Sequence, residues 1–331
     1  MHPSDVFIPG LATGIGSLPH MDPVAAAEAV FAAFSGLPAV PQLPQRSPRE
    51  GMCAQVARFI PGVAVAPTGE LVRAPGADGT DALDAESWAG LIGFLEVGTT
   101  RGIVPERIKV QCAGPITMAM TLSRIGFSAP EAMILASTGV RRCIQALETS
   151  LRHVFPDSAL VVLLDEPGLA SWSDDDGFTD RESATDLLSG ALATVTGVSG
   201  VHVCGNGDRR LALDAGPDVL SIEVRSDVLD DVSVLGRFLD NDGWIVWGAV
   251  PTDRPIGEAP EPLWRALVSN WCVCTQSGFD PVRVRAQAII SPACGLAMHR
   301  VPQAEHAMAL AGALAARVHE QAAAARLTLG A

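Results

Sequence analysis

The feature that most constrains this chain is a regular alternation of short β-branched runs with longer, alanine-rich stretches of helical period. Eight runs have the character of strands: residues 11–17, 39–44, 108–113, 159–165, 198–204, 218–223, 243–250 and 286–291. Helical stretches separate them, most clearly residues 23–34, 85–99, 130–155, 181–195 and 304–327. Such alternation is typical of a parallel sheet, and a count of eight favours closure into a (β/α)8 TIM barrel.

Two segments interrupt this alternation. Residues 63–73 contain two strand-like pieces around Pro67, Thr68 and Gly69, which predicts a small hairpin inserted at about residues 61–75, after the second strand. Residues 42–49 carry prolines among polar residues and indicate a long loop at the carboxyl end of that strand. No linker or internal repeat divides the chain, so we expect one catalytic barrel domain over residues 1–331.

Charge and motif content disfavour several classes of function. Lys and Arg number 23 against 37 Asp and Glu, and this net charge of −14 argues against binding to nucleic acid or to an anionic membrane surface. The chain has neither a long apolar run nor the signature of a signal peptide, so we expect a cytoplasmic protein. Glycine-rich nucleotide-binding motifs are absent. The seven cysteines lack paired spacing, which argues against a disulfide framework and leaves thiolate chemistry open.

Metal-binding residue types lie at the ends of three predicted strands. In a barrel of parallel strands the functional side chains lie at the carboxyl ends. His202 and Cys204 are two residues apart and therefore face the same side of the fifth strand, Glu223 ends the sixth strand, and Cys294 follows the eighth. Taken singly, each could be a packed core residue. Together, one imidazole, two thiolates and one carboxylate predict a tetrahedral Zn²⁺ site.

The runs that carry these residues resemble the cobalamin-independent methionine synthase family. The matching runs are residues 14–19 (GIGSLP), 164–167 (LDEP), 201–206 (VHVCGN) and 291–296 (SPACGL). The resemblance extends from residue 13 to about residue 300, and it covers only the catalytic C-terminal barrel of that family. The chain also looks like the wider barrel superfamily that holds methylcobamide:thiol methyltransferases and uroporphyrinogen decarboxylase.

This resemblance implies a zinc-dependent methyltransferase that moves a methyl group to the thiol of homocysteine and gives methionine. The implied zinc ligands are His202, Cys204, Glu223 and Cys294. The implied carboxylate-binding turn is Ile15, Gly16 and Ser17. Asp165 would hold the substrate ammonium, and Glu166 is a second candidate catalytic acid, although an acid that caps a helix has the same signature.

The sequence departs from the family in two places. Residues 250–255 (VPTDRP) replace a family run whose histidine is the proton donor, and Asp253 and His20 are the unmatched candidates for that role. Residues 44–51 replace an acidic run, which leaves Glu50 as the candidate for a second amine-binding carboxylate.

The methyl donor therefore stays open. A methyl group on a tertiary nitrogen needs a general acid before it can leave, whereas a methyl group on a corrinoid cobalt does not. We expect either methylcobamide, carried for example on a corrinoid protein, or methyltetrahydrofolate. Two alternatives also stay open, namely a methylcobamide-dependent enzyme that acts on a different thiol and a non-catalytic barrel that binds zinc or thiols.

Overall fold

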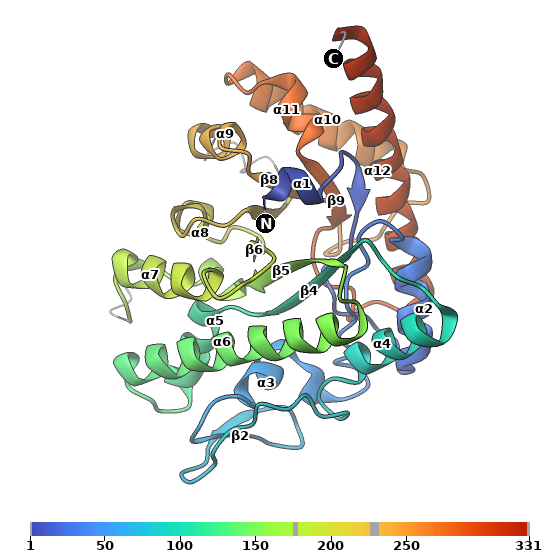
Figure 1. The fold of residues 1–331 in the computed structure, drawn as a ribbon. Helices are drawn as coiled ribbons and strands as arrows, with labels where there is room; N and C mark the ends of the chain where they lie inside the picture. The colour runs from blue at the N-terminus through green and yellow to red at the C-terminus, as the bar shows by residue number, and fades with distance from the viewer. Residues whose placement is uncertain (1, 175–177, 226–231, 330–331) are drawn as a thin grey trace.

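A curled sheet of seven parallel strands forms the centre of the computed structural model, which describes residues 2–174, 178–225 and 232–329 (Figure 1). In order across the sheet the strands are β1 (Leu11–Ala12), β9 (Ala288–Pro292), β8 (Trp244–Val250), β7 (Val219–Glu223), β6 (Val198–Val203), β5 (Ala159–Asp165) and β4 (Arg107–Ala113). Strands β4 to β9 are neighbours in sequence order, as expected for helical crossover connections that return each strand to the same end of the sheet.

Helices cover the outer side of this sheet (Figure 1), except for the first one along the chain, whose Val6 packs inside the curl. They are α1 (Pro3–Val6), α2 (Pro23–Ala33), α3 (Met52–Ala57), α4 (Ala89–Arg101), α5 (Pro115–Arg124), α6 (Ala129–Val154), α7 (Arg181–Leu192), α8 (Arg209–Asp214), α9 (Val232–Asp240), α10 (Glu261–Gln276), α11 (Pro281–Ala286) and α12 (Val301–Leu329). Short polar side chains set several of their N-termini: Asp22 accepts from the Val24 N–H at α2, and Ser128 and Glu131 form a capping box at α6. No helix in the described ranges has the length and apolarity needed to cross a bilayer.

The second predicted strand is the part of the barrel prediction that was wrong. Residues 39–44 form no strand; instead, Ala39 makes an isolated parallel bridge with Lys109 of β4, and Gln42 makes another with Ser17. The cause is local, because prolines at positions 38, 41 and 44 lack the N–H donors that a continuous ladder requires. β1 is likewise confined to Leu11–Ala12 of the predicted 11–17. The central sheet thus has seven strands among the described residues, and an eight-stranded ladder is not observed there.

A separate antiparallel pair lies apart from the central sheet. β2 (Val63–Val65) and β3 (Leu71–Arg73) pair in register from Val63 with Arg73 to Val65 with Leu71. Gly69 has a φ of +84°, a left-handed conformation that glycine adopts without strain, and it allows the tight turn between them. This pair falls within the 61–75 range assigned to a hairpin from the sequence.

Strand residues of opposite parity enter two different cores, and this division places the site. Val161 and Leu163 of β5 belong to a cluster inside the curl, which α1 closes with Val6. Leu164 and its even-numbered neighbours in β5 pack outward against the helices. Because side chains alternate along a strand, Asp165 continues the inward row at the carboxyl end. The inside of the sheet is therefore apolar toward the amino ends of the strands and carries polar groups toward the carboxyl ends.

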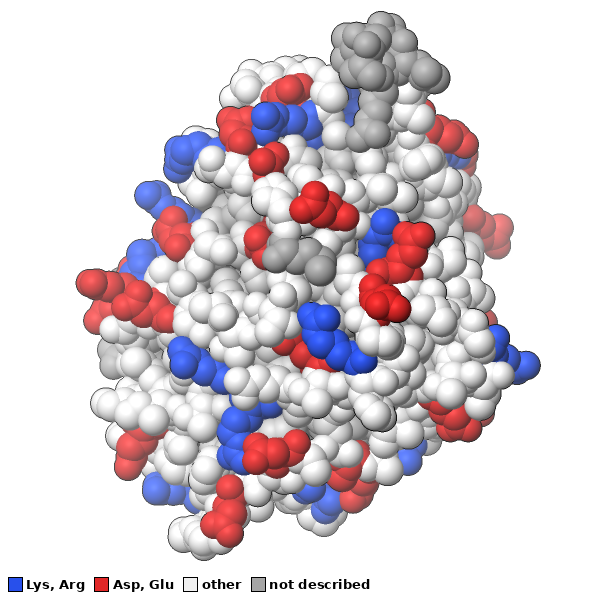
Figure 2. Space-filling model, in the orientation of Figure 1, with Lys and Arg blue, Asp and Glu red and all other residues white. Residues whose placement is uncertain are grey.

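The surface carries both signs of charge. On the face shown in Figure 2, acidic and basic side chains are interspersed among larger uncharged areas. The described residues on this face form no continuous basic surface of the kind that a nucleic acid requires.

Candidate functional site

Three of the predicted metal ligands lie together at the carboxyl ends of the strands. One ligand atom from each of His202, Cys204 and Cys294 lies within 4.8 Å of the others. The Cys204 Sγ lies 3.0 Å from His202 Nε2 and 3.7 Å from Cys294 Sγ. Two thiolates bound tetrahedrally to zinc at about 2.3 Å each are about 3.8 Å apart. The spacing of the two sulfurs and the soft donor set therefore fit a zinc ion.

Ser221 orients the imidazole of this cluster. His202 is paired with Ser221 across β6 and β7, and its Nδ1 lies 2.9 Å from the Ser221 Oγ. Metal-binding histidines are commonly oriented by a hydrogen bond to their other ring nitrogen. This contact leaves Nε2 directed at the cysteines. Ser221 was missed from the sequence, although it lies two residues before Glu223 and so shares its face of the strand.

The thiols of Cys204 and Cys294 are in contact, and this contact shifts their pKa values in opposite directions. A hydrogen bond from the Cys204 thiol, with help from His202 and the Gly295 N–H, lowers the pKa of Cys294 to about 4. The pKa of Cys204 is raised, first because its proton is held between the sulfurs and second because the thiol is buried. A cation at this position would offset the repulsion between two thiolates.

Glu223 lies beside the cluster without joining it. Its Oε1 is 3.4 Å from the Gly205 N–H, and its Oε2 is 3.5 Å from Arg225 Nη1. It is the one predicted ligand whose oxygens lie outside the group formed by the other three. Its role as a fourth ligand stays a prediction.

A cavity of about 420 Å³ opens next to the cluster. Its lining includes Glu223, Arg225, Asp253, Arg254 and Ala293, and Ala293 is the chain neighbour of Cys294. The cavity is therefore large enough to admit a small molecule from solvent to the edge of the cluster.

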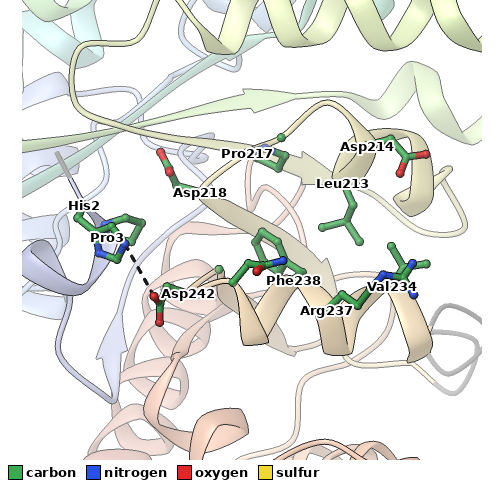
Figure 3. A pocket seen from close by; sticks show the side chains of 13 residues that line it. His2, Pro3, Leu213, Asp214, Pro217, Asp218, Val234, Arg237, Phe238 and Asp242 are labelled. Atoms are coloured by element: carbon green, nitrogen blue, oxygen red, sulfur yellow. Dashed lines mark ion pairs between the residues drawn. The ribbon is translucent and has the colours of Figure 1, made fainter.

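A second cavity, of about 370 Å³, lies at the opposite ends of the strands (Figure 3). Asp218, which precedes β7, lines it, and the His2 and Asp242 side chains form an ion pair of 3.9 Å across it. None of the predicted site residues reaches this end.

Asp165 is a buried carboxylate beside the cluster with an unpaired oxygen. It ends β5 in register with His202, is 6% exposed, and its Oδ1 has no hydrogen-bond partner. Burial raises the pKa of this carboxyl to about 6, while His202 and Lys109 lower it. Because buried polar atoms are almost always satisfied, this oxygen is suited to a ligand that donates a hydrogen bond.

The carboxylate of Glu166 is directed toward a helix instead. It accepts from the N–H groups of Ile116 and Thr117 at 2.8 Å each and from the Thr117 hydroxyl at 2.6 Å. Gly114 is required beside it, since a Cβ there would collide with the carboxylate. Burial raises the pKa of Glu166 to about 7. These contacts favour the helix-capping interpretation, at the N-terminus of α5, over contact with substrate.

The turn of Ile15, Gly16 and Ser17 has its carbonyl groups bound and its N–H groups free. The Ile15 carbonyl accepts from Lys109 Nζ at 2.6 Å, and the Gly16 and Ser17 carbonyls accept from the Gln42 and Leu296 N–H groups at 3.0 and 2.8 Å. Within the described part of the chain, no protein acceptor meets the three N–H groups of the turn. Ile15 and Gly16 are buried, so these donors are suited to an anion such as a carboxylate.

Close packing places this turn against the loop that carries Cys294. A Cβ on Gly295, which follows Cys294, would collide with the Ser17 hydroxyl. Gly16 has a φ of +135°, and a Cβ there would collide with the Gln111 amide. The glycines thus let the turn lie between β4 and the Cys294 loop.

Three further candidates lie in different surroundings. Glu50, in the short helix η1 (Pro48–Glu50), is 1% exposed and accepts from the Leu43 and Gly90 N–H groups at 3.2 Å each, so it fastens its loop to α4. His20 is 4% exposed and its Nε2 lies 3.5 Å from a Glu305 carboxylate oxygen. Asp253 lines the cavity beside the cluster.

The similarity of this chain to known proteins is found in its fold and not in its sequence. Neither a protein-family profile nor a curated protein matches the chain. A provisionally assigned vitamin-B12-independent methionine synthase from Listeria monocytogenes superposes with a TM-score of 0.59 at 14% identity, over 90% of this chain and 86% of that one. A methyltransferase from Methanosarcina mazei superposes with a TM-score of 0.52 at 16% identity, with the same coverage of 90% and 86%. At these identities the comparisons establish a shared fold.

Proposed function

We propose that this protein is a zinc-dependent methyltransferase that transfers a methyl group to the thiol of homocysteine and produces methionine. The observation that carries the proposal is the cluster of His202, Cys204 and Cys294 beside two unsatisfied binding groups, the Asp165 carboxylate and the N–H groups of the 15–17 turn. The names of the two structural neighbours, a methionine synthase and a methyltransferase, support the same class.

The metal would be held by His202, Cys204 and Cys294, with Glu223 as the proposed fourth ligand. Zinc bound there would lower the pKa of a coordinated substrate thiol and so supply a thiolate nucleophile near neutral pH. Four protein ligands would close a tetrahedral site, so we propose that Glu223 gives up its place to the substrate thiol. The site would then have the open position that is typical of catalytic zinc, in contrast to closed structural sites.

The protein's own groups would orient the amino acid. Asp165 would accept hydrogen bonds from the substrate ammonium, and the N–H groups of Ile15, Gly16 and Ser17 would donate to its carboxylate. Both ends of the amino acid are then fixed by buried groups, which exclude water and hold the side-chain thiol at the cluster. A thiol that lacks either end should be a poorer acceptor.

For the donor we propose methylcobamide, presented on a corrinoid protein, with methyltetrahydrofolate as the competing donor. The substrate sulfur forms a bond to the methyl carbon, and the cobalt–carbon bond breaks with its electron pair left on cobalt as Co(I). No proton is needed, which agrees with the lack of a histidine in residues 250–255. With methylfolate the leaving nitrogen must be protonated, and Asp253 in the adjoining cavity is the residue we assign to that task.

The test is a donor and acceptor comparison on protein of known zinc content. The purified protein is offered L-homocysteine with methylcobalamin or with methyltetrahydrofolate, and methionine is quantified. We expect one zinc per chain and methionine from methylcobalamin. Zinc without methionine from either donor would favour a non-catalytic binding protein, and faster methylation of a thiol without the amino-acid group would favour a different acceptor.

A further inference from the structure

Lys109 is a buried amine that the proposed chemistry leaves without a role. It is the sole lysine of the chain, lies on β4 and is 1% exposed. Its Nζ donates to the Ile15 carbonyl at 2.6 Å and to the Gln111 Oε1 at 2.8 Å, and Gln111 in turn donates to the Val40 carbonyl at 2.9 Å. In the described ranges no carboxylate lies within ion-pair distance of this amine. A buried charge held only by neutral acceptors is costly to maintain, so its position calls for a functional explanation.

The contact with Ile15 determines where one free N–H group points. The Ile15 carbonyl and the Gly16 N–H belong to the same planar trans peptide, so they point in opposite directions. By binding the carbonyl from the β4 side, Lys109 turns the Gly16 N–H away from β4. The two other carbonyls of the turn are bound by different segments, at Gln42 and Leu296. The orientation of this first peptide therefore depends on Lys109.

Charge adds to this orientation. Burial lowers the pKa of Lys109 to about 8, while the nearby Asp165 raises it, so the amine is mostly protonated at neutral pH. A positive charge thus contacts the turn at the Ile15 carbonyl, and the negative charge of Asp165 lies at the carboxyl end of the neighbouring strand β5. The two charges have the polarity that an amino-acid zwitterion would match, with its carboxylate at the turn and its ammonium at Asp165.

We propose that Lys109 is a positioning residue that makes the site selective for thiols with an α-carboxylate: it holds the Ile15–Gly16 peptide so that the Gly16 N–H faces the ligand carboxylate, and it places a positive charge behind that group. This proposal rests on the proposed function in taking an amino-acid thiol as the ligand. Lys109 itself stays buried under the turn and does not touch the metal ligands.

The test compares two thiols that differ only in the carboxylate. L-homocysteine and 3-aminopropane-1-thiol are titrated by calorimetry into zinc-loaded wild type and Lys109→Met under anaerobic conditions. Loss of a charge-assisted contact should weaken homocysteine binding by about 10- to 100-fold. Binding of 3-aminopropane-1-thiol should change by less than about threefold, because this thiol does not use the turn. Zinc content should be unchanged.

Matched variants separate positioning from a general loss of structure. Cys112→Ala removes a buried side chain of the same strand that packs outward, and it should leave the ratio of the two affinities as in wild type. Gln111→Leu removes an acceptor of the Lys109 ammonium, and it should lower the ratio even if Lys109→Met fails to fold.

The outcomes distinguish this inference from the function on which it rests. If wild type prefers homocysteine and both variants keep that preference, or lose affinity for the two thiols equally, the role of Lys109 is overturned and the proposed function stands. If wild type binds neither thiol, or binds both equally, the proposed amino-acid site is itself wrong and the role of Lys109 fails with it.

Discussion

Replacing Asp165 with Asn should make the zinc-free protein more stable, by an amount that grows with pH. Burial of this carboxyl raises its pKa from 3.8 to about 6, and its Oδ1 is unpaired. The unfolded chain therefore releases this proton at lower pH than the native protein, so the native state loses stability between about pH 4 and pH 6 and the loss is constant above that range. A pKa displaced by this much corresponds to about 3 kcal/mol.

Chemical denaturation of zinc-free wild type and Asp165→Asn at pH 4 and pH 8, followed by circular dichroism, measures the effect. We expect almost equal stabilities at pH 4. At pH 8 the variant should be more stable by about 1 to 3 kcal/mol, the lower figure applying if the new amide is itself left unpaired. The exposed Asp157→Asn is the control and should show no pH-dependent difference. A less stable Asp165→Asn at pH 8, or a difference independent of pH, would refute the idea that this carboxylate is unsatisfied until a ligand binds.

Four further outcomes follow from the described contacts. Asp165→Asn should keep its zinc but bind L-homocysteine about 10- to 100-fold more weakly by calorimetry, with 4-mercaptobutanoate, which has no amine, unaffected. Cys294→Ser should lose most of its zinc by elemental analysis, whereas Cys272→Ser, an exposed cysteine, should keep it; equal zinc contents would remove Cys294 from the ligand set. Ser221→Ala should lower zinc affinity about 10- to 100-fold in a chelator competition, and an unchanged affinity would deny its orienting role. Glu166→Gln should destabilise the fold by about 2 to 4 kcal/mol in thermal unfolding, because its amide group meets N–H donors; lost activity at full stability would instead favour a catalytic role.

The sequence correctly predicted strands that are buried on both faces, such as β5. The prediction failed at residues 39–44, where prolines prevent the strand that the apolar pattern indicates. β5 (Ala159–Asp165) has the predicted bounds, since a continuous apolar run is buried whichever way each residue faces. The apolar residues of 39–44 gave the same pattern, but the prolines among them prevent a ladder.

The sequence predicts those site residues whose positions follow from where a strand ends. It does not predict the orientation of a side chain that could contact several different partners. His202 and Cys204 share a face because they are two residues apart, and their approach to Cys294 follows from where β6 and β9 end. The orientation of Glu223 toward Gly205 depends on a tertiary contact that no spacing encodes. No sequence pattern indicates that the Lys109 side chain reaches Ile15, and only the structure shows this contact.

The two isolated bridges of residues 39–42 form a seam between the two edges of the curled sheet, at β1 and β4. β4 and β5 are in register over seven residues, from Arg107 to Ala113, whereas the link from β1 to β4 passes through single bridges at Ala39 and Gln42. Amide protons along this seam should exchange with solvent sooner than those of the continuous ladder. The 15–17 turn lies on this seam, because Ser17 forms one of its bridges. An amino acid bound at the turn would add contacts across the seam, and its binding should therefore slow amide exchange there.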